Sequence, residues 1–325
     1  MEVVQEKSKN LNTKLESGVR LKNFFFNYGI IFAFIFLFVI LSILSNSFLT
    51  FENIINVLRQ ISINAILAIG ATFVILTAGI DLSVGSIVAL AGIVTATFAQ
   101  SGHSNLIISI VMGLAVGLFV GFINGFVTAK WKVAPFITTL GMMAVARGAT
   151  FVYTGGQPVA NLSQSFLQIG GGDIAKIPLP VIITVVVSII FMVLLYKTKF
   201  GRYVYAIGGN ENAAKISGIK VDKVKIWVYS ISGLLAGLAG IILTSRVSSG
   251  LPQAGDGYEL DAIAAVVIGG TSLMGGKGRL WGSLIGALLI GVLNNGLDLL
   301  NVSSYWQQIV KGCIIVAAVM IERKK

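Results

Sequence analysis

Residues 105–129 read NLIISIVMGLAVGLFVGFINGFVTA and contain no charged side chain. A helix of this length is able to cross the ~30 Å hydrocarbon core of a membrane. Within it glycine recurs at every fourth position, at Gly113, Gly117, Gly121 and Gly125. At 3.6 residues per turn these glycines share one helix face, where a neighbouring backbone can approach closely. A shorter series follows at Gly233, Gly237 and Gly240, and the two series predict a tightly packed helical bundle.

The composition of the whole chain agrees with a membrane protein. Of 325 residues, 55% are hydrophobic and only 11% are charged, and the mean hydropathy is +0.89. These proportions leave too little polar surface for a soluble domain. A single cysteine, Cys313, and a single histidine, His103, argue against a disulfide framework and against a metal centre. We therefore expect no metal and no cofactor.

The apolar runs predict about ten transmembrane helices in one all-α domain that spans residues 1–325. They lie at 28–45, 53–78, 84–100, 105–129, 135–153, 180–196, 226–245, 260–274, 281–300 and 305–321. The run at 260–274 is short, so we expect a broken or tilted helix there. The polar segment 1–27 lacks the pattern of a cleavable signal and predicts a cytoplasmic N-terminal extension.

The positions of the basic residues orient this bundle. With ten spans and both termini in the cytoplasm, all but five of the 24 Lys and Arg residues fall on the cytoplasmic side. The five exceptions are Arg59, Arg147, Lys176, Arg246 and Lys311. This distribution explains the net charge of +11 without nucleic acid as a partner. It also predicts a multi-pass protein in contact with membrane lipid.

The string GIDLSVGS, residues 79–86, separates two of the predicted spans. Gly79 is suited to ending one helix, and Asp81 or Ser83 to capping the next. A tight capped turn explains the string by itself. A contact or gating turn at the cytoplasmic face is the functional alternative.

The largest predicted cytoplasmic loop covers residues 197–225. Asn210 is suited to capping a short helix over residues 211–216, and Gly218 to ending it in a left-handed conformation. Such a helix below the membrane is a plausible knob for a partner protein. The alternative is a basic loop that only contacts lipid headgroups.

Residues 271–278, TSLMGGKG, look like a phosphate-binding loop but do not meet its pattern. That pattern needs glycine where Thr271 stands and Ser or Thr where Gly278 stands. If ATP powers this protein, another chain binds it. The sequence also offers no catalytic residue set, so we expect no enzyme activity.

Several polar side chains lie in or near the spans, where they are expensive in lipid. Those suited to a sugar path are the amides Gln60, Asn64, Asn294 and Asn295. Hydrogen bonding between helices is the alternative for each of them. Lys311 follows Trp306 closely and is expected to extend to the outer interface.

A weak internal repeat aligns residues 64–86 with residues 261–283. The matches include Ala65 with Ala262, Gly79 with Gly276 and Gly85 with Gly282. Internal repeats are common in transporters. These matches over 23 residues predict a repeat, and chance matching of small residues is the alternative.

Several strings together resemble one family. They are residues 79–86, GRYVYAIGGNE at 201–211, GYELDAIAAVV at 257–267, GGTSL at 269–273, GGKGR at 275–279 and LNNGL at 293–297. They resemble the permease subunits of sugar ABC importers, which are related to the branched-chain amino acid importers. The resemblance runs from about residue 46 to the end of the chain.

The resemblance implies a pore for ribose or a closely related sugar in the bacterial cytoplasmic (inner) membrane. It implies a second copy of the permease, separate ABC ATPase subunits that hydrolyse ATP, and an extracytoplasmic sugar-binding protein. Contacts with the ATPase would fall in the coupling loop 197–225 and the 79–86 turn, at Asn210, Glu211, Ala213, Ala214, Gly218 and Asp81. Contacts with the binding protein would fall on two outer loops, at Asp173, Lys176, Arg246, Asp256 and Glu259.

Two alternatives stay open. One is a permease for another sugar or for a furanosyl signal molecule. The other is an ion-coupled secondary transporter, which needs an ionisable group near the midplane with a relay partner. Only Arg147 is a candidate for that group, and the sequence shows no acid paired with it.

Overall fold

The structure is a computed structural model that describes residues 31–102 and 105–323. The predicted segment 1–27 and His103 lie outside the described residues. The helices are Ile31–Leu44, α2 (Phe51–Leu76), α3 (Val84–Phe98), α4 (Leu106–Lys130), α5 (Pro135–Thr154), α6 (Gln164–Gly171), α7 (Leu179–Lys197), α8 (Lys199–Gly209), α9 (Glu211–Ile216), α10 (Val221–Val247), α11 (Tyr258–Ile268), α12 (Leu280–Leu299) and α13 (Ser304–Arg323). Two short strands, β1 (Asp173–Ile174) and β2 (Ile177–Pro178), pair antiparallel.

The prediction of an all-α polytopic membrane protein is confirmed. Helices occupy every predicted run, and six of those in the described residues are long and apolar enough to cross a membrane: α2, α4, α5, α7, α10 and α12. α3 and α11 have 15 and 11 residues, which cover only about 22 and 16 Å. The break expected within the 260–274 run is present, since α11 ends at Ile268. The shortness of α3 was not predicted.

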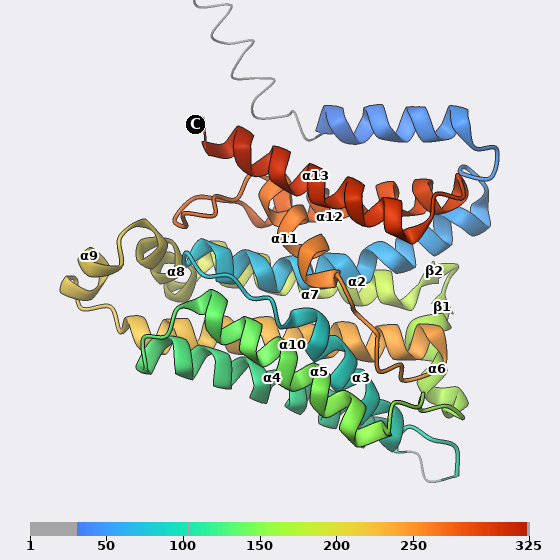
Figure 1. The fold of residues 1–325 in the computed structure, drawn as a ribbon, viewed down its shortest axis with the longest axis horizontal. Helices are drawn as coiled ribbons and strands as arrows, with labels where there is room; N and C mark the ends of the chain where they lie inside the picture. Colours follow the sequence, from blue (N-terminus) through green and yellow to red (C-terminus); the bar gives the residue numbers. More distant parts are fainter. Residues whose placement is uncertain (1–30, 103–104, 324–325) are drawn as a thin grey trace, which may run out of the picture.

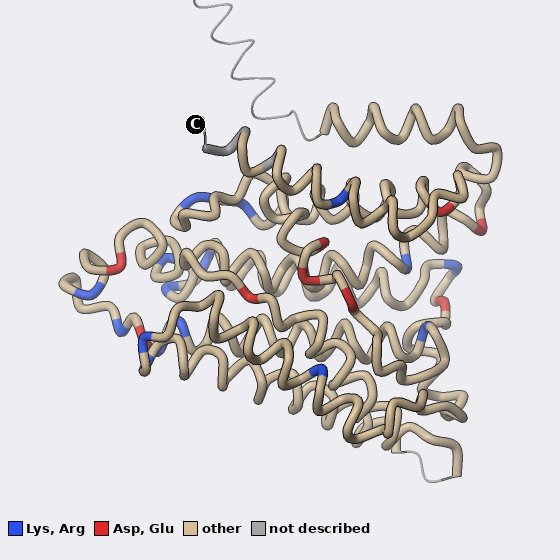
Figure 2. Tube along the Cα trace, viewed as in Figure 1, with Lys and Arg blue, Asp and Glu red and all other residues tan. Residues whose placement is uncertain are grey.

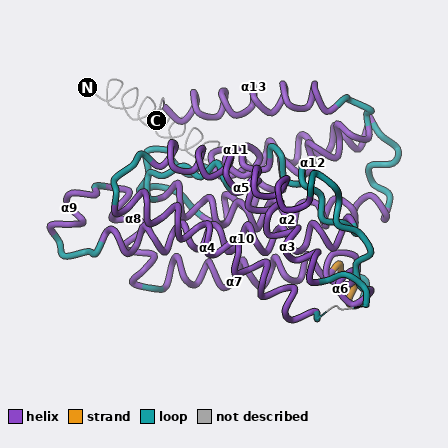
Figure 3. The backbone as a smooth tube through the Cα atoms, turned by 60° about the horizontal axis from the view of Figure 1, so that its bottom comes forward, coloured by secondary structure: helices purple, strands orange, loops and turns teal. Residues whose placement is uncertain are grey.

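The long helices run side by side, with α6 at one end of the bundle and α8 and α9 at the other (Figures 1 and 3). We call these the α6 end and the α9 end. Local signals start and stop the helices as expected. Asn105 accepts hydrogen bonds from the first turn of α4, Pro135 opens α5, and Gly155 ends α5 with a φ of 59°.

Helix α2 lies at the centre of the bundle, against α7, α10, α11 and α12. Every residue from Ile61 to Leu76 is buried. α5 and α7 lie at the periphery and leave large apolar side chains exposed, for example Val152 and Ile189. In a membrane protein such a surface faces lipid, so α2 forms the protein core and α5 and α7 form part of its lipid boundary.

The two glycine series face each other between α4 and α10, as their spacing predicts for close helix contact. A side chain at Gly117 would meet the backbone of Gly233 and Gly237, and one at Gly121 would meet Gly233 and Tyr229. Only hydrogen in place of Cβ permits this approach. The contact joins α4 to α10 over most of their length.

Two non-helical segments enter the bundle from opposite ends (Figure 1). Residues 77–83 run inward from the α9 end to the start of α3, and residues 248–257 run inward from the α6 end to the start of α11. The first turns of the two short helices meet, because a side chain at Gly85 would touch Glu259 and Gly255. Gly85 lies about 20 Å along α3 from Phe98. The two helix starts therefore meet well inside the bundle.

Both members of the predicted repeat have the order helix, break, helix. Residues 64–86 cover the end of α2, the 77–83 segment and the start of α3. Residues 261–283 cover α11, the 269–279 loop and the start of α12. Thr72 and Ser283, one from each segment, share a hydrogen bond of 2.8 Å. A common origin of the two segments stays a prediction.

Candidate functional site

Asp81 anchors the first non-helical segment inside the bundle. Its Oδ1 accepts hydrogen bonds from the Ser83 backbone at 3.0 Å and the Ser83 hydroxyl at 2.6 Å, and its Oδ2 accepts one from Ser232 of α10 at 2.9 Å. Asn124 of α4 donates to the Ser83 hydroxyl at 2.8 Å. The carboxylate therefore joins the start of α3 to α10 and, through Ser83, to α4.

This position corrects the sequence interpretation of the 79–86 string. We predicted a turn at the cytoplasmic face with Asp81 among the coupling residues, but Asp81 is only 4% exposed. The segment continues inward from the end of α2 instead of turning back at the surface. Asp81 is thus a buried support within the bundle and presents nothing to a partner in this conformation.

Helix α5 supplies hydrogen-bond donors to both non-helical segments. Arg147 donates to the carbonyl oxygens of Pro252 at 2.8 Å and Ala254 at 2.9 Å. Thr139 donates to the carbonyl of Ile80 at 3.1 Å. Backbone groups outside helices need such partners at membrane depth. Arg147 therefore holds the 248–257 segment through carbonyl partners that the sequence did not identify.

A second buried polar cluster lies between α11, α12 and α13. Lys311 Nζ lies 3.0 Å from Asp261 Oδ1, and Asn294 donates to Asp261 Oδ2 at 3.2 Å. Asp261 is 3% exposed. The sequence prediction for Lys311 differs from this, because we expected it to extend to the outer interface. An acid within an apolar run needs a partner in lipid, and that signal pointed to Asp261.

The predicted sugar-path amides fall into different surroundings. Asn294 contacts Asp261, whereas Asn295 and Asn53 exchange two side-chain hydrogen bonds, at 3.1 and 2.8 Å. Gln60 is half-buried and Asn64 is buried, both on α2. Asn295 therefore links α12 to the start of α2.

The predicted contacts with a binding protein divide into two groups. Asp173 and Lys176 are exposed on the β1–β2 hairpin at the α6 end, where Asp173 pairs with Arg59 at 2.9 Å. Arg246 is half-buried near the end of α10, and Asp256 lies on the inward segment. Glu259 differs most from the prediction of an outer-loop position. It lies in the first turn of α11 against Gly85.

The local structure predicted for the 210–218 segment is confirmed. Asn210 Oδ1 accepts a hydrogen bond from the Ala213 backbone at 2.9 Å, α9 covers residues 211–216, and Gly218 follows with a φ of 83°. The helix is at the tip of the α9 end (Figure 1).

The predicted coupling residues of α9 lie on different faces of the helix, some exposed and some buried. Ala213 is exposed, whereas Ala214 is buried and Glu211 pairs with Lys225 at 2.6 Å. Ile216 is 88% exposed and was missed by the sequence analysis. An apolar residue so exposed on a short helix is a typical contact for a partner protein.

Helices α8 and α9 are connected to the bundle by close backbone contacts. A side chain at Gly208 would meet the end of α2 at Leu76 and the loop at Gly276, and the Gly276 backbone donates to Leu76 at 2.9 Å. Tyr205 donates to the carbonyl of Gly278 at 2.9 Å. Burial raises the pKa of Tyr205 to about 12, so its hydroxyl stays protonated and able to donate. These contacts join α8, which leads directly into α9, to α2 and the 269–279 loop.

Comparison with known proteins gives relatives along nearly the whole chain. The chain is 57% identical to the ribose import permease protein RbsC of Bacillus subtilis over 88% of this chain and 89% of that protein. It is 50% identical to RbsC of Escherichia coli K12 over 90% and 92%. It is 42% identical to the D-allose transport system permease protein AlsC of the same strain over 92% of both chains. No solved structure matches the chain.

Residues 53–319 match the family described as branched-chain amino acid transport system / permease component. This range runs from the first turn of α2 to four residues before the end of α13 and includes both inward segments and the α9 tip. The chain belongs to the family of permease components of branched-chain amino acid transport systems.

Proposed function

We propose that this chain is the pore-forming subunit of an ATP-driven importer for ribose. The observation that carries this proposal is the 57% identity to a ribose import permease over 88% of the chain. Identity to the D-allose and L-arabinose permeases is lower, at 42%. Because the identity to the ribose permease is higher over a similar share of the chain, ribose is favoured over these two sugars.

The proposed topology has ten crossings with both termini in the cytoplasm. Lys and Arg are concentrated at the α9 end of the bundle (Figure 2). Cytoplasmic ends of membrane helices carry an excess of these residues. The α9 end would then face the ATPase and the α6 end the binding protein. The short helices α3 and α11 complete their crossings with the two inward segments.

Coupling to the ATPase is proposed to use the exposed face of α9. Ala213, Ile216 and Gly218 would contact the partner, since all three are exposed at the tip. Asn210 and Glu211 would maintain the helix through its cap and the bond to Lys225. Ala214 would support the docked position from the buried face.

The sugar path is proposed to pass beside α2, where Gln60, Asn64 and Asn294 offer amide groups. Amides both donate to and accept from sugar hydroxyls. Asn294 Oδ1 has no donor among the described residues although it is buried. A hydroxyl donor at this atom would offset the cost of burying it. Asn295 supports the path indirectly through Asn53.

The remaining partners follow from the importer proposal. A second copy of the chain would complete the pore, and separate ATPase subunits would hydrolyse ATP. Asp173 and Lys176 would lie closest to the extracytoplasmic binding protein, because the hairpin that carries them is exposed at the α6 end. Selectivity for the sugar would reside mostly in that protein.

One observation favours the ion-coupled alternative. The sequence offered no acid–base pair at membrane depth, yet Asp261 and Lys311 form one. Such pairs serve as proton relays in some transporters. The importer remains the better-supported function because the ribose, D-allose and L-arabinose relatives named here are transport permeases.

Transport by reconstituted protein separates the two. Liposomes would contain this chain, its ATPase and its binding protein, with ATP inside and labelled ribose outside. We expect uptake that requires all three proteins and that unlabelled ribose inhibits better than xylose or allose. Uptake of another sugar would retain the importer and reject ribose. Uptake by this chain alone under an ion gradient would reject the importer.

A further inference from the structure

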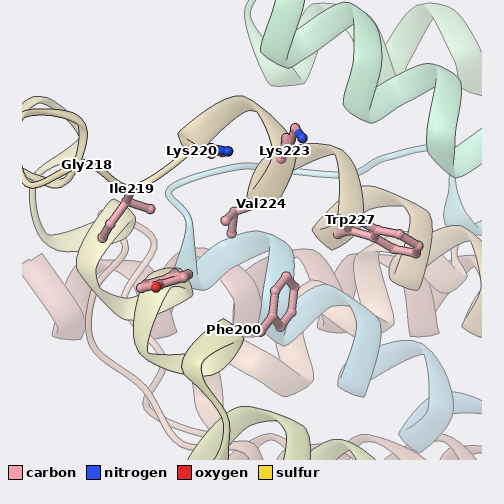
Figure 4. Close-up of a pocket in the computed structure, with 8 residues that line it drawn as sticks. Phe200, Gly218, Ile219, Lys220, Lys223, Val224 and Trp227 are labelled. Carbon is pink, nitrogen blue, oxygen red and sulfur yellow. The ribbon is translucent and has the colours of Figure 1, made fainter.

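A pocket of about 240 Å³ lies at the α9 end, between α8 and the start of α10. Aromatic and aliphatic side chains form most of its wall, with two lysines at one side (Figure 4). The residues that matter here are Phe200, Tyr203, Lys220, Lys223, Val224 and Trp227. No amide or carboxylate side chain lines it. This chemistry is unsuited to a sugar and suited to an amphiphile with an anionic group.

The α10 residues of this pocket continue into an exposed or half-buried stripe. In order along the chain the stripe reads Lys220, Lys223, Trp227, Ile231 and Leu234. Membrane helices commonly carry cations at the level of the headgroups, tryptophan at the interface and aliphatic residues in the hydrocarbon region. The stripe has its residue types in this order. Trp227 is 61% exposed. The pocket therefore opens at the level of a membrane interface.

The two lysines of the pocket are available to a ligand. The neighbouring acid Asp222 contacts Lys130 and Lys132, at 3.5 and 2.9 Å. Among the described residues, neither Lys220 nor Lys223 forms an ion pair. Within the part of the chain that the structure describes, the positive charge beside the pocket thus has no acidic partner, and the neighbouring Asp222 is already paired.

We propose that the pocket binds an anionic phospholipid of the leaflet at the α9 end, with its phosphate between Lys220 and Lys223. At about 240 Å³ the pocket is smaller than sites that enclose a whole ligand of drug size, ~300–1,000 Å³. Only the upper part of one acyl chain enters, against Phe200 and Trp227. The remainder follows the aliphatic stripe of α10. The proposal goes beyond the transport function and requires only the membrane position of the chain.

The position of the pocket gives the lipid a structural consequence. Phe200 stacks on Phe73 of the central helix α2, with ring centroids 6.3 Å apart. Ile219, which also lines the pocket, directly follows Gly218 at the end of the α9 segment. A lipid bound there packs between the α9 tip and the core. It would support the contact between α2 and α8, which leads directly into α9.

Lipid retention by the purified full chain tests the proposal. The protein is exchanged into detergent with equal phosphatidylglycerol and phosphatidylcholine, and bound lipid is measured by native mass spectrometry. We expect preferential retention of phosphatidylglycerol. In the variant K220Q/K223Q the ratio of bound phosphatidylglycerol to bound phosphatidylcholine should fall about 30-fold. Each lysine near an anionic headgroup contributes roughly five-fold to binding, and the variant removes two of them.

The matched control is K197Q/K277Q, which removes two exposed cations that do not line the pocket. This variant should retain phosphatidylglycerol as the parent does. Equal loss in both double variants would reduce the effect to net charge and overturn the proposal. Equal retention of the two lipids by the parent would overturn it as well. Thermal unfolding of each variant in detergent verifies that the folds are intact.

Fluorescence locates the lipid. A variant that retains Trp227 as its only tryptophan should be quenched by phosphatidylglycerol brominated near the glycerol end of its acyl chains. Lys220→Gln with Lys223→Gln in the same chain should reduce the quenching. If adding the ATPase abolishes quenching and covers the pocket, a protein surface is the occupant and the lipid proposal fails.

Discussion

Asp261 of α11 and Lys311 of α13 form an ion pair of 3.0 Å, with the carboxylate almost completely buried. Removing one partner leaves an uncompensated charge in a medium that solvates it poorly. We expect Asp261→Asn or Lys311→Met to lower stability by about 3–5 kcal/mol, measured as loss of thermal stability in detergent. The double variant D261N/K311M should recover a large part of this loss. A double variant as unstable as the sum of both singles would contradict the pairing.

The close contact between the glycine series predicts that alanine substitutions at different glycines change stability by different amounts. Gly121→Ala should destabilise the protein by about 1–3 kcal/mol, because its Cβ would meet the backbone of α10. Gly141→Ala on α5 is the control, since a Cβ there meets nothing nearby. Alanine favours a helix, so this variant should be unchanged or slightly more stable. Equal thermal stability of both variants would refute the close α4–α10 packing.

Ile216 offers a direct test of the docking surface. We expect Ile216→Asp to abolish ATP-driven uptake and ATPase copurification, because a charge replaces the most exposed apolar contact on α9. Ile216→Val should preserve both. The amount of protein in the membrane should be equal for the two variants. Normal transport by the aspartate variant would exclude α9 as the coupling helix.

Arg147 should control access to the 248–257 segment. Replacing it by methionine removes both hydrogen bonds, to Pro252 and Ala254, and releases the segment from α5. In a background with Cys313→Ser, we expect a cysteine introduced at exposed Gln253 to react several-fold faster with maleimide in Arg147→Met than in the parent. A cysteine at Lys176 should react at the same rate in both. Unchanged reactivity at position 253 would contradict this role.

The proposed orientation is tested with an impermeant maleimide on intact cells. In the same Cys313→Ser background, Lys176→Cys should react from outside because it lies on the hairpin of the α6 end. Lys215→Cys on α9 should react only after the membrane is permeabilised. Labelling of position 215 in intact cells would reverse the orientation and reject the ATPase contact proposed there.

The sequence predicted those features that depend on a single stretch of chain. Helix positions follow from apolar length, the α9 cap follows from Asn210 and Gly218, and the close face of α4 follows from glycine spacing. Each property is set by residues within a few turns of each other. These predictions agree with the structure to within a few residues, and similarity to known permeases supports the same function.

Most of the features that were missed join distant segments. Helical periodicity tells which residues share a face but not which helix lies opposite. The pairing of Lys311 with Asp261 and the carbonyl partners of Arg147 therefore stayed hidden. Asp81 was misplaced for a related reason, because an apolar run has the same composition whether its helix begins at the surface or halfway across. The buried position becomes visible only when Ser232 is brought beside it.

The contact between the first turns of α3 and α11 also determines the order in which parts of the protein can pack during synthesis. The first turn of α3 is covered by Gly255 and Glu259, which leave the ribosome long after α3 itself. Until then the start of α3 lacks its neighbour, and free backbone N–H groups are costly in hydrocarbon. The nascent protein therefore cannot complete its centre one helix at a time. The first turn of α3 becomes fully packed only after α11, which lies more than 150 residues later in the chain, has been inserted.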